Sequence, residues 1–416
     1  MRKSGNYIQI FEHQTLRIGD VQHDIIFTEQ HWNQLLQLNE RQYPPYFQII
    51  HQGIKALHYV GVIALEGLTL EILPKTNSQS STQTRLLLLD MLKVSGKIPS
   101  GSTNSSLADT KGNLFDFFLF SFVSEVEMLV SKGLINQYRK VKRNEPSFKG
   151  KILIQEQVRK NCVHKERVFT EHQVFDSHHM LNAFIRIALE KTLKITFNQQ
   201  LISKVKRLLP YFPVVSPQVD FSKLNRLRLS REEAHYEEAL DWAQFIHKHL
   251  KPKFSPGKLR CQCFLVNMQQ LFEDYVVITL RKSAAEFGCK IEPQARSRFW
   301  KQRSIRPDMV LTTAEGETVI LDTKWKMLKS HEPDDADLKQ IYIYNRFFKA
   351  RRGILLYPQQ TKAISYAADY HHTGESPISC EVAFIDMYTE NDFLPEDWAK
   401  KLFQRIINKT TVSSEA

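Results

Sequence analysis

The sequence lacks the segments that direct a protein into or across a membrane. Across its 416 residues, no apolar run reaches the roughly 18 residues that a membrane-spanning helix needs. The N-terminus, MRKSGNYIQIFEHQ, also lacks the hydrophobic core of a signal peptide. Both absences predict a cytoplasmic protein.

Cysteine is scarce, with five residues scattered along the chain. The one close pair, Cys261 and Cys263, has no second pair that would complete a zinc site. We therefore interpret the cysteines as reduced structural thiols.

A third absence concerns nucleotide binding. The chain does not contain G-x-x-x-x-G-K-[ST], the glycine-rich loop whose backbone amides cradle the phosphates of a nucleotide. If the function requires energy from nucleotide hydrolysis, another chain must supply it. The sequence also shows no internal repeat.

The composition that is present, 42% hydrophobic and 25% charged, is that of an ordinary globular protein. A chain of this length is expected to fold as two or three domains. Its net charge of +12 favours a polyanionic partner, although basic charge can also serve solubility alone.

Basic residues are concentrated in two places. From Lys132 to Arg167 the chain has eleven Lys or Arg residues against three Glu. The second group leads into Asp308 and includes aromatic residues: Arg296, Arg298, Phe299, Trp300, Lys301, Arg303 and Arg306. Because cations interleaved with aromatic rings suit phosphate contacts and stacking, we predict that the second group binds DNA. A solvated charged face is the alternative for either run.

Segments rich in turn-forming residues divide the chain. Thr76–Thr84 is polar, and Ser95–Asn113 is a longer linker of Gly, Ser and Asn. Before them, Tyr59–Lys75 predicts a β-hairpin that turns at Glu66-Gly67. We predict a multidomain α+β or α/β protein with a β-rich N-terminal domain (1–94), a linker (95–113), a mainly helical, basic middle region (114–250), a C-terminal domain (251–408) and a tail (409–416).

The order of elements in the sequence of the C-terminal domain predicts a mixed sheet flanked by helices. Apolar residues at helical spacing indicate an amphipathic helix over Phe264–Phe287, and a second helix is expected over Asp334–Arg351. The predicted strands are Met309–Thr313 and Thr318–Lys324, joined by a turn at Gly316, followed by Ile354–Tyr357 and Val382–Ile385.

Two acids and a lysine lie on the predicted hairpin. Because side chains two apart on a strand share a face, Asp322 and Lys324 point the same way while Thr323 points the other. The hairpin can bring Asp308 beside them. Such charges on an apolar sheet are unfavourable unless they pair or hold a cation.

A hard cation such as Mg²⁺, or Mn²⁺ in its place, suits carboxylate ligands from Asp308 and Asp322 and can also bind phosphate oxygens. Lys324 can position an attacking water or help to deprotonate it. The set therefore predicts metal-assisted hydrolysis of phosphodiester bonds. A buried Asp–Lys ion pair is the alternative for D-x-K alone, and the Pro-Asp pair, the hairpin spacing and the basic lead-in count against it.

Pro307-Asp308 followed by Asp322-Thr323-Lys324 resembles the PD-(D/E)xK nuclease motif, which implies a restriction-endonuclease-like fold. Gln340 and Tyr344 resemble the Q-x-x-x-Y helix motif of a subset of that superfamily, which implies a place in the catalytic site. Glu273 lies in a predicted helix where several members carry a further acidic metal ligand. A Glu that merely faces solvent is the alternative there.

A wider resemblance covers residues 59–358. VGVIALEGLTLEILPK, GLINQYRKV, FKGKILIQEQVRKN and ILDTKWK are similar, in this order, to segments of the McrC family, the nuclease subunits of McrBC modification-dependent restriction systems. The resemblance implies that the N-terminal part engages a hexameric AAA+ GTPase, McrB, and that the C-terminal domain cuts double-stranded DNA. It also implies that the partner usually recognises the modified base.

Three functions are compatible with these observations. The favoured one is a Mg²⁺-dependent DNA endonuclease subunit of a restriction complex. A nuclease of the same fold that acts alone, for example in repair, would cut DNA without a partner. A non-catalytic DNA-binding scaffold would be expected to lack part of the Asp-Asp-Lys set, and here all of it is present.

Overall fold

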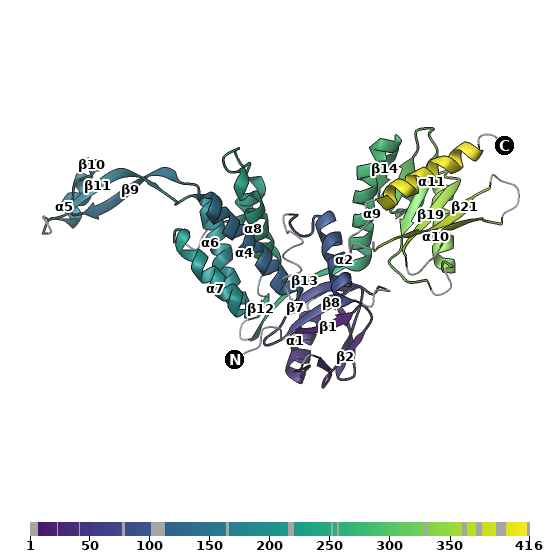
Figure 1. Ribbon diagram of the computed structural model, residues 1–416, viewed down its shortest axis with the longest axis horizontal. Coiled ribbons are helices and arrows are strands. Elements are labelled where there is room, and N and C mark those ends of the chain that lie inside the picture. The colour runs from purple at the N-terminus through teal and green to yellow at the C-terminus, as the bar shows by residue number, and fades with distance from the viewer. Residues whose placement is uncertain are drawn as a thin grey trace. The chain divides into compact units, whose positions relative to one another are not determined.

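The computed structural model describes residues 7–22, 24–40, 42–76, 80–100, 113–163, 166–214, 220–250, 253–255, 258–328, 332–359, 364–371, 377–387 and 397–413 (Figure 1). The chain divides into two compact units, residues 1–5 with 101–251, and residues 6–100 with 252–416. Within the described ranges, no helix is both long enough and apolar enough to cross a membrane.

The first unit is built on helices that pack around aromatic side chains. Its helices are α4 (Leu114–Lys132), α5 (Ile154–Lys160), α6 (Met180–Ile195), α7 (Gln199–Leu208) and α8 (Glu237–His249), with short 3-10 turns η1 (Leu209–Tyr211), η2 (Phe221–Arg226) and η3 (Ala234–Tyr236). The Asn113 side chain accepts a hydrogen bond from the Asp116 amide and so caps α4. The ring of Phe118 on α4 lies 5.1 Å from that of Phe245 on α8, and burial of such rings joins the helices.

Between α4 and α6 the chain forms an arm that the sequence did not predict. β9 (Gln137–Glu145) and β11 (Val168–Asp176) pair antiparallel along their whole length, and β10 (Lys151–Ile152) pairs with β11. Figure 1 shows this sheet and α5 extending away from the helices of the unit. The middle region is therefore less helical than expected. Val141 is the one buried residue of β9, so the strand lacks the apolar alternation by which strands are recognised.

The second unit begins with two sheets that share one core. The larger has the strand order β1 (Tyr7–Phe11), β8 (Thr69–Leu73), β7 (Tyr59–Ala64), β13 (Lys258–Asn267), β12 (Lys253–Ser255), and the smaller has β2 (Thr15–Arg17), β6 (Gly53–Ala56), β5 (Phe47–Ile50). β3 (Val21–Gln22) pairs with β4 (Ile25–Ile26), and the helices are α1 (Glu29–Glu40) and α2 (Ser81–Val94). The hairpin predicted at Tyr59–Lys75 is confirmed as β7 and β8, with Gly67 in the turn at a φ of 85°.

The helix predicted over Phe264–Phe287 is wrong at its start. Residues 258–267 form β13, and α9 (Met268–Ala284) begins after Asn267, whose side chain accepts a hydrogen bond from the Gln270 amide. β13 pairs with β7 so closely that a Cβ on Gly61 would lie 2.1 Å from the Phe264 carbonyl oxygen. β12 and β13 thus belong to the N-terminal sheet, although both lie beyond the expected domain boundary at 251.

The C-terminal part of the second unit is a mixed sheet, as predicted. Its strand order is β14 (Lys290–Pro293), β17 (Met309–Thr312), β18 (Thr318–Thr323), β19 (Arg352–Pro358), β21 (Ser379–Ile385), β20 (Tyr366–Asp369). β18, β19 and β21 run parallel, and the remaining pairings are antiparallel. On one face α10 (Asp335–Phe347) buries Ile341 in a cluster with Ile320 and Leu355.

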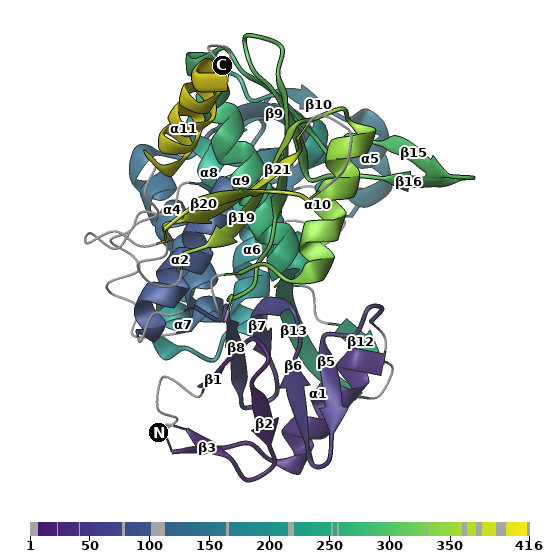
Figure 2. The same cartoon turned by 90° about the vertical axis from the view of Figure 1, so that its right-hand side faces the viewer.

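The remaining elements surround this sheet. After α9 come η4 (Ala285–Phe287) and a separate hairpin of β15 (Ser297–Trp300) and β16 (Arg303–Ile305), which projects from the sheet in Figure 2. α11 (Asp397–Ser413) meets α9, because the Trp398 indole donates a hydrogen bond to the Tyr275 hydroxyl at 3.0 Å.

The predicted linker and tail lie only partly within the described residues. α2 ends at Val94 and residues 95–100 follow it, whereas 101–112 are outside the described ranges. At the C-terminus α11 continues to Ser413, past the expected end of the domain near Asn408, and 414–416 are outside the description. α10 is shorter than expected, since it ends at Phe347 and not at Arg351.

Candidate functional site

The hairpin of β17 and β18 places Asp308 opposite Asp322. The register pairs Met309 with Leu321, so the preceding and following residues face each other at the end of the ladder. The Thr323 amide and hydroxyl both donate to Asp308 Oδ2, each at 2.7 Å. Among the described residues, Asp308 Oδ1 has no hydrogen bond. This leaves one carboxylate oxygen available while the other fixes the orientation of the group.

The side chains of Asp322 and Lys324 meet, as their spacing predicted. Lys324 Nζ lies 2.6 Å from Asp322 Oδ2, and the two side chains are 13% and 3% exposed. The Lys324 amide donates to the Leu356 carbonyl at 2.9 Å, which keeps this residue alongside β19 after β18 has ended. The pair is therefore held at the end of a buried parallel strand.

The positive charge of Lys324 does not fully offset the burial of Asp322 and the negative charges near it. Burial, together with the charge of the Asp308 carboxylate, raises the pKa of Asp322 to about 7 against the opposing effect of Lys324. For Lys324, burial alone would lower the pKa, but Asp322 more than offsets this and the pKa is raised. Lys324 is thus a charged hydrogen-bond donor near neutral pH and not a free base.

Gln340 and Tyr344 on α10 complete a chain of hydrogen bonds with the lysine. Lys324 Nζ donates to Gln340 Oε1 at 2.7 Å, and Gln340 Nε2 donates to the Tyr344 hydroxyl at 2.8 Å. A spacing of four residues puts both side chains on one face of the helix. Burial raises the pKa of Tyr344, so its hydroxyl stays protonated. The structure therefore brings together the sequence-predicted residues of the sheet and of the helix.

Glu273 on α9 faces Asp308. The Glu273 carboxylate accepts hydrogen bonds from Gln294 Nε2 at 2.9 Å and from Gln270 Nε2 at 3.1 Å. Burial raises the pKa of Glu273, and the charge of Asp308 adds to the shift. The backbone amide of Gln294 also donates to the backbone carbonyl of Asp308 at 2.8 Å, so Gln294 contacts both residues. Glu273 is partly buried and hydrogen-bonded, and its role as a metal ligand stays a prediction.

The donor set fits a hard divalent cation. Asp308 and Asp322 offer carboxylate oxygens from adjacent strands, and Glu273 adds a third carboxylate near Asp308. Burial raises the pKa values of Asp322 and Glu273, the charge of Asp308 adds to both shifts, and Lys324 offsets only part of the shift at Asp322, so a further positive charge would stabilise both acids. A bound cation would supply that charge.

Residues 54–358 match the model of one protein family, the McrBC 5-methylcytosine restriction system component. The match covers well over half of the chain. The chain belongs to the McrBC family. It is therefore a restriction-system subunit, and the resemblance seen in the sequence is confirmed. The PD-(D/E)xK assignment and the roles of the site residues stay predictions.

Solved structures share the fold of this McrBC-family chain. One is a refined half-complex from a tetradecameric assembly of Thermococcus gammatolerans McrB AAA+ hexamers with bound McrC; the TM-score is 0.73 at 20% identity, and the alignment covers 97% of this chain and 100% of that chain. The cryo-EM structure of the Thermococcus gammatolerans McrBC complex has a TM-score of 0.50 at 21% identity, covering 67% of this chain and 88% of that chain. No match was found among curated proteins.

One acid of the McrBC-family site was missed in the sequence. Asp337, on the same face of α10 as Gln340, is buried and accepts a hydrogen bond from the Tyr357 hydroxyl at 2.6 Å. Lys326 Nζ also lies 2.6 Å from Asp337 Oδ2. The signal was present in the sequence, because residues three and four apart on a helix share a face and a buried acid on the same face as Gln340 is unusual.

The predicted DNA-binding residues lie on the hairpin of β15 and β16 and beside it. Arg296, Arg298, Trp300, Lys301, Arg303 and Arg306 are all exposed. Lys301 Nζ lies 4.8 Å from the centre of the Trp300 ring, and the Arg303 guanidinium 5.8 Å. The cations are thus gathered around an aromatic ring that is 56% exposed. DNA binding by this group stays a prediction.

Proposed function

We propose that the chain is the DNA endonuclease subunit of a McrBC-type restriction complex in the cytoplasm. It would hydrolyse phosphodiester bonds of double-stranded DNA with Mg²⁺, or Mn²⁺ in its place, through a PD-(D/E)xK site. The observation that carries the proposal is the constellation of Asp308, Asp322 and Lys324 at one end of a hairpin, joined to Gln340 by hydrogen bonds.

Each residue has a role that follows from its contacts. Asp308 and Asp322 would hold the cation, with Glu273 as a further ligand beside Asp308. When bound, the cation polarises the phosphate and favours the ionised form of a nearby water. Lys324 is charged and is held at its ammonium by Gln340, so it is suited to orient the attacking water and to stabilise developing negative charge.

Gln340 and Tyr344 would act by keeping Lys324 in place. The Gln340 side chain has its carbonyl oxygen committed to the lysine and its amide committed to the tyrosine. These two bonds fix the orientation of the Gln340 amide. Supporting hydrogen bonds of this kind can hold a catalytic group within a fraction of an ångström of its working position.

A partner chain is part of the proposal. The chain has no nucleotide-binding loop of the G-x-x-x-x-G-K-[ST] type. The solved structure that shares its fold contains McrC bound to McrB AAA+ hexamers, which supports an AAA+ GTPase partner here. We propose that this partner recognises the modified DNA and switches on cleavage.

Single substitutions test the chemistry. Asp308→Ala, Asp322→Ala and Lys324→Ala should each reduce Mg²⁺-dependent cleavage by about 100-fold or more, because each removes a group that stabilises charge in the transition state. Asp335→Ala, on an exposed acid of α10, is the matched control and should cut normally. Wild-type cleavage rates for a folded Asp322→Ala protein would exclude the proposed site.

A second experiment tests the dependence on the partner. The purified chain should bind DNA but cut it slowly, and the cognate AAA+ GTPase with GTP should accelerate cutting. A non-hydrolysable GTP analogue should allow assembly with little cleavage. Rapid cutting without partner or GTP would favour the stand-alone nuclease, whereas DNA binding without cleavage under any of these conditions would favour the scaffold.

A further inference from the structure

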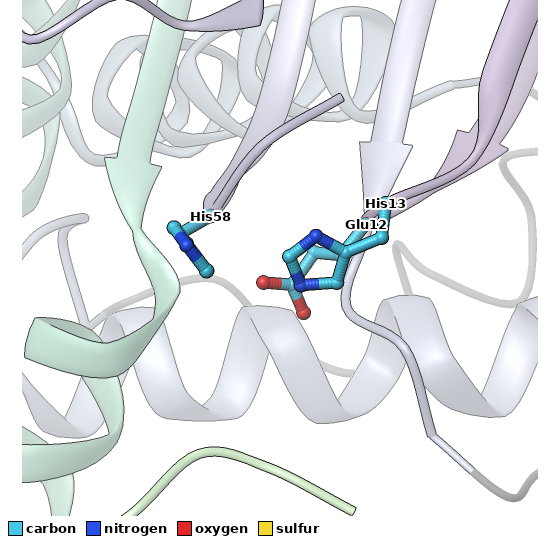
Figure 3. A group of neighbouring side chains, drawn as sticks. All are labelled: Glu12, His13 and His58. Atoms are coloured by element: carbon cyan, nitrogen blue, oxygen red, sulfur yellow. The ribbon is translucent and has the colours of Figure 1, made fainter. Parts of the chain in front are cut away.

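A second cluster of metal-ligand side chains lies in the N-terminal sheet, apart from the acids of β17 and β18. Glu12 and His13 follow β1, and His58 lies in the turn between β6 and β7. One ligand atom from each residue lies within 4.8 Å of the others. In Figure 3 the Glu12 carboxylate and the His13 ring lie together and face His58 across a small gap.

Backbone hydrogen bonds tie the two turns together. The Glu12 amide donates to the Leu73 carbonyl at 2.9 Å, and the His13 amide donates to the Ala56 carbonyl at 3.1 Å. His13 has a φ of 64°, a left-handed conformation that residues other than glycine adopt uncommonly. The centres of the His13 and His58 rings are consequently only 4.9 Å apart. Strained backbone of this kind concentrates at sites where a side chain must be aimed.

The Glu12 carboxylate is the independent sign of a ligand. The residue is 2% exposed, and its Oε2 accepts hydrogen bonds from the Trp325 indole at 2.8 Å and from the Lys75 amide at 3.0 Å. Its other oxygen, Oε1, is buried and has no hydrogen-bond partner among the described residues. Buried carboxylate oxygens are nearly always satisfied, so an orphaned one next to two imidazoles calls for a cation.

We propose that Glu12, His13 and His58 bind a divalent transition metal of the zinc class. Two imidazole nitrogens and one carboxylate oxygen suit Zn²⁺, and three protein ligands leave a position for water. Mg²⁺ is a poor match, because it prefers oxygen ligands throughout. The bonds from Trp325 and Lys75 to Oε2 are the outer contacts that orient a carboxylate ligand.

The charges around the cluster are compatible with this site. Burial raises the pKa of Glu12 to about 7, as expected for a carboxylate that lacks a counter-charge. Burial, with smaller effects from His58, Lys55 and Lys75, lowers the pKa of His13, so its ring is neutral and able to bind metal near neutral pH. The positive charges of Lys55 and Lys75 would repel a bound cation and so weaken its binding, but they leave the three ligands in place.

The proposed metal site is also connected to the segment that follows β18, through the hydrogen bond from Trp325 to Glu12. Trp325 directly follows Lys324, and its ring lies 5.3 Å from that of Phe272 on α9. A metal held by Glu12 would fix the carboxylate whose second oxygen holds Trp325. The metal would therefore stabilise the contact between the N-terminal sheet and the segment that follows β18.

Metal binding can be measured without any cleavage assay. The full chain would carry Asp308→Asn and Asp322→Asn, so that the nuclease acids do not compete, and would be dialysed against Zn²⁺ and analysed for bound metal. We expect one equivalent of Zn²⁺. Co²⁺ at the same site should give the visible absorption of a four-coordinate N/O complex.

Substitutions then assign the site. His13→Asn keeps a residue that tolerates the left-handed backbone, and His58→Ala removes an exposed ring; each should weaken Zn²⁺ binding by at least about 100-fold, since loss of an outer contact alone costs about 10- to 100-fold. Trp325→Phe should weaken binding by about 10-fold or more. His51→Ala, an exposed histidine in the neighbouring turn, should bind like the parent.

Two results would contradict the proposed Zn²⁺ site. Absence of Zn²⁺ from the parent, or wild-type affinity in both His13→Asn and His58→Ala, would overturn the proposal. Both variants alter exposed side chains, and matched circular dichroism and unfolding curves would show that a loss of binding is not a loss of fold. Because cleavage is absent throughout, failure here leaves the proposed nuclease function untouched.

Discussion

Asp322→Asn should make the metal-free protein more stable at alkaline pH while it abolishes cleavage. The Asp322 side chain is 3% exposed, and burial is the main cause that raises its pKa from 3.8 to about 7. Because the folded-state value lies above that of the unfolded chain, the folded protein keeps its proton as the pH rises, and the wild type loses stability between about pH 4 and pH 7. The asparagine variant has no group to ionise at this position.

The size of the effect follows from the pKa. Each pH unit over which only the folded state is protonated changes the free energy of unfolding by about 1.4 kcal/mol. Between about pH 5 and pH 8 the variant should therefore gain about 3 kcal/mol relative to wild type, since ionisation is complete above the folded pKa. Glu12, whose pKa is also about 7, is present in both proteins and cancels in the difference. In the variant, Lys324 loses Asp322 but keeps the charges of Asp337 and Asp308, which still oppose the effect of burial on its pKa.

Denaturant unfolding in EDTA, followed at several pH values in both proteins, measures this difference. Adding Mg²⁺ should then stabilise the wild type and leave the variant nearly unchanged, because only the wild type has the full ligand set. Parallel pH profiles in EDTA would refute the reasoning, since they would mean that Asp322 is ionised in the metal-free fold at no cost.

Three further outcomes are expected. Gln340→Ala should lower the cleavage rate by about 10- to 100-fold and leave Mg²⁺ affinity nearly unchanged, because it releases Lys324 without removing a ligand; Mg²⁺ titrations of the rate separate the two effects. Neutralising Arg298 and Arg303 together should weaken binding to all DNA sequences and reduce the salt slope by about one unit per lost phosphate contact, and an unchanged slope would mean that these charges only solubilise the hairpin. Gly61→Ala should destabilise the second unit by more than about 2 kcal/mol in unfolding experiments, because its Cβ would meet the Phe264 carbonyl oxygen at 2.1 Å.

The candidate site was predictable because its geometry is local. Asp308, Asp322 and Lys324 belong to one hairpin, and strand alternation with a short turn is enough to place them together. Gln340 and Tyr344 could be placed on one helix face from their spacing, but their hydrogen bonds to Lys324 required the packing of α10 on the sheet.

The elements that were missed depend on contacts between distant parts of the chain. The residues of β13 are apolar at positions that also fit a helix, and pairing with β7 decides between the two. β9 and β11 stabilise each other through their own ladder and not through an apolar face, so periodicity gives no sign of them. Glu12 and His58 come from separate turns, and no spacing in the sequence joins them.

The path of the chain explains why no boundary separates the N-terminal sheet from the C-terminal sheet within the second unit. β13 leaves the N-terminal sheet at Asn267 and continues directly into α9, where Glu273 faces Asp308. On the other side of the site, Trp325 contacts the N-terminal sheet through its hydrogen bond to Glu12.

A partner that moved the N-terminal sheet would therefore displace Glu273, a proposed metal ligand, through α9. It would also displace Trp325, which directly follows Lys324. Packed side chains and rigid secondary structure can carry such coupling, and β13 and α9 are continuous from the N-terminal sheet to Glu273. Under the proposed function, activation of cleavage from the N-terminal part of the chain would require no separate moving domain.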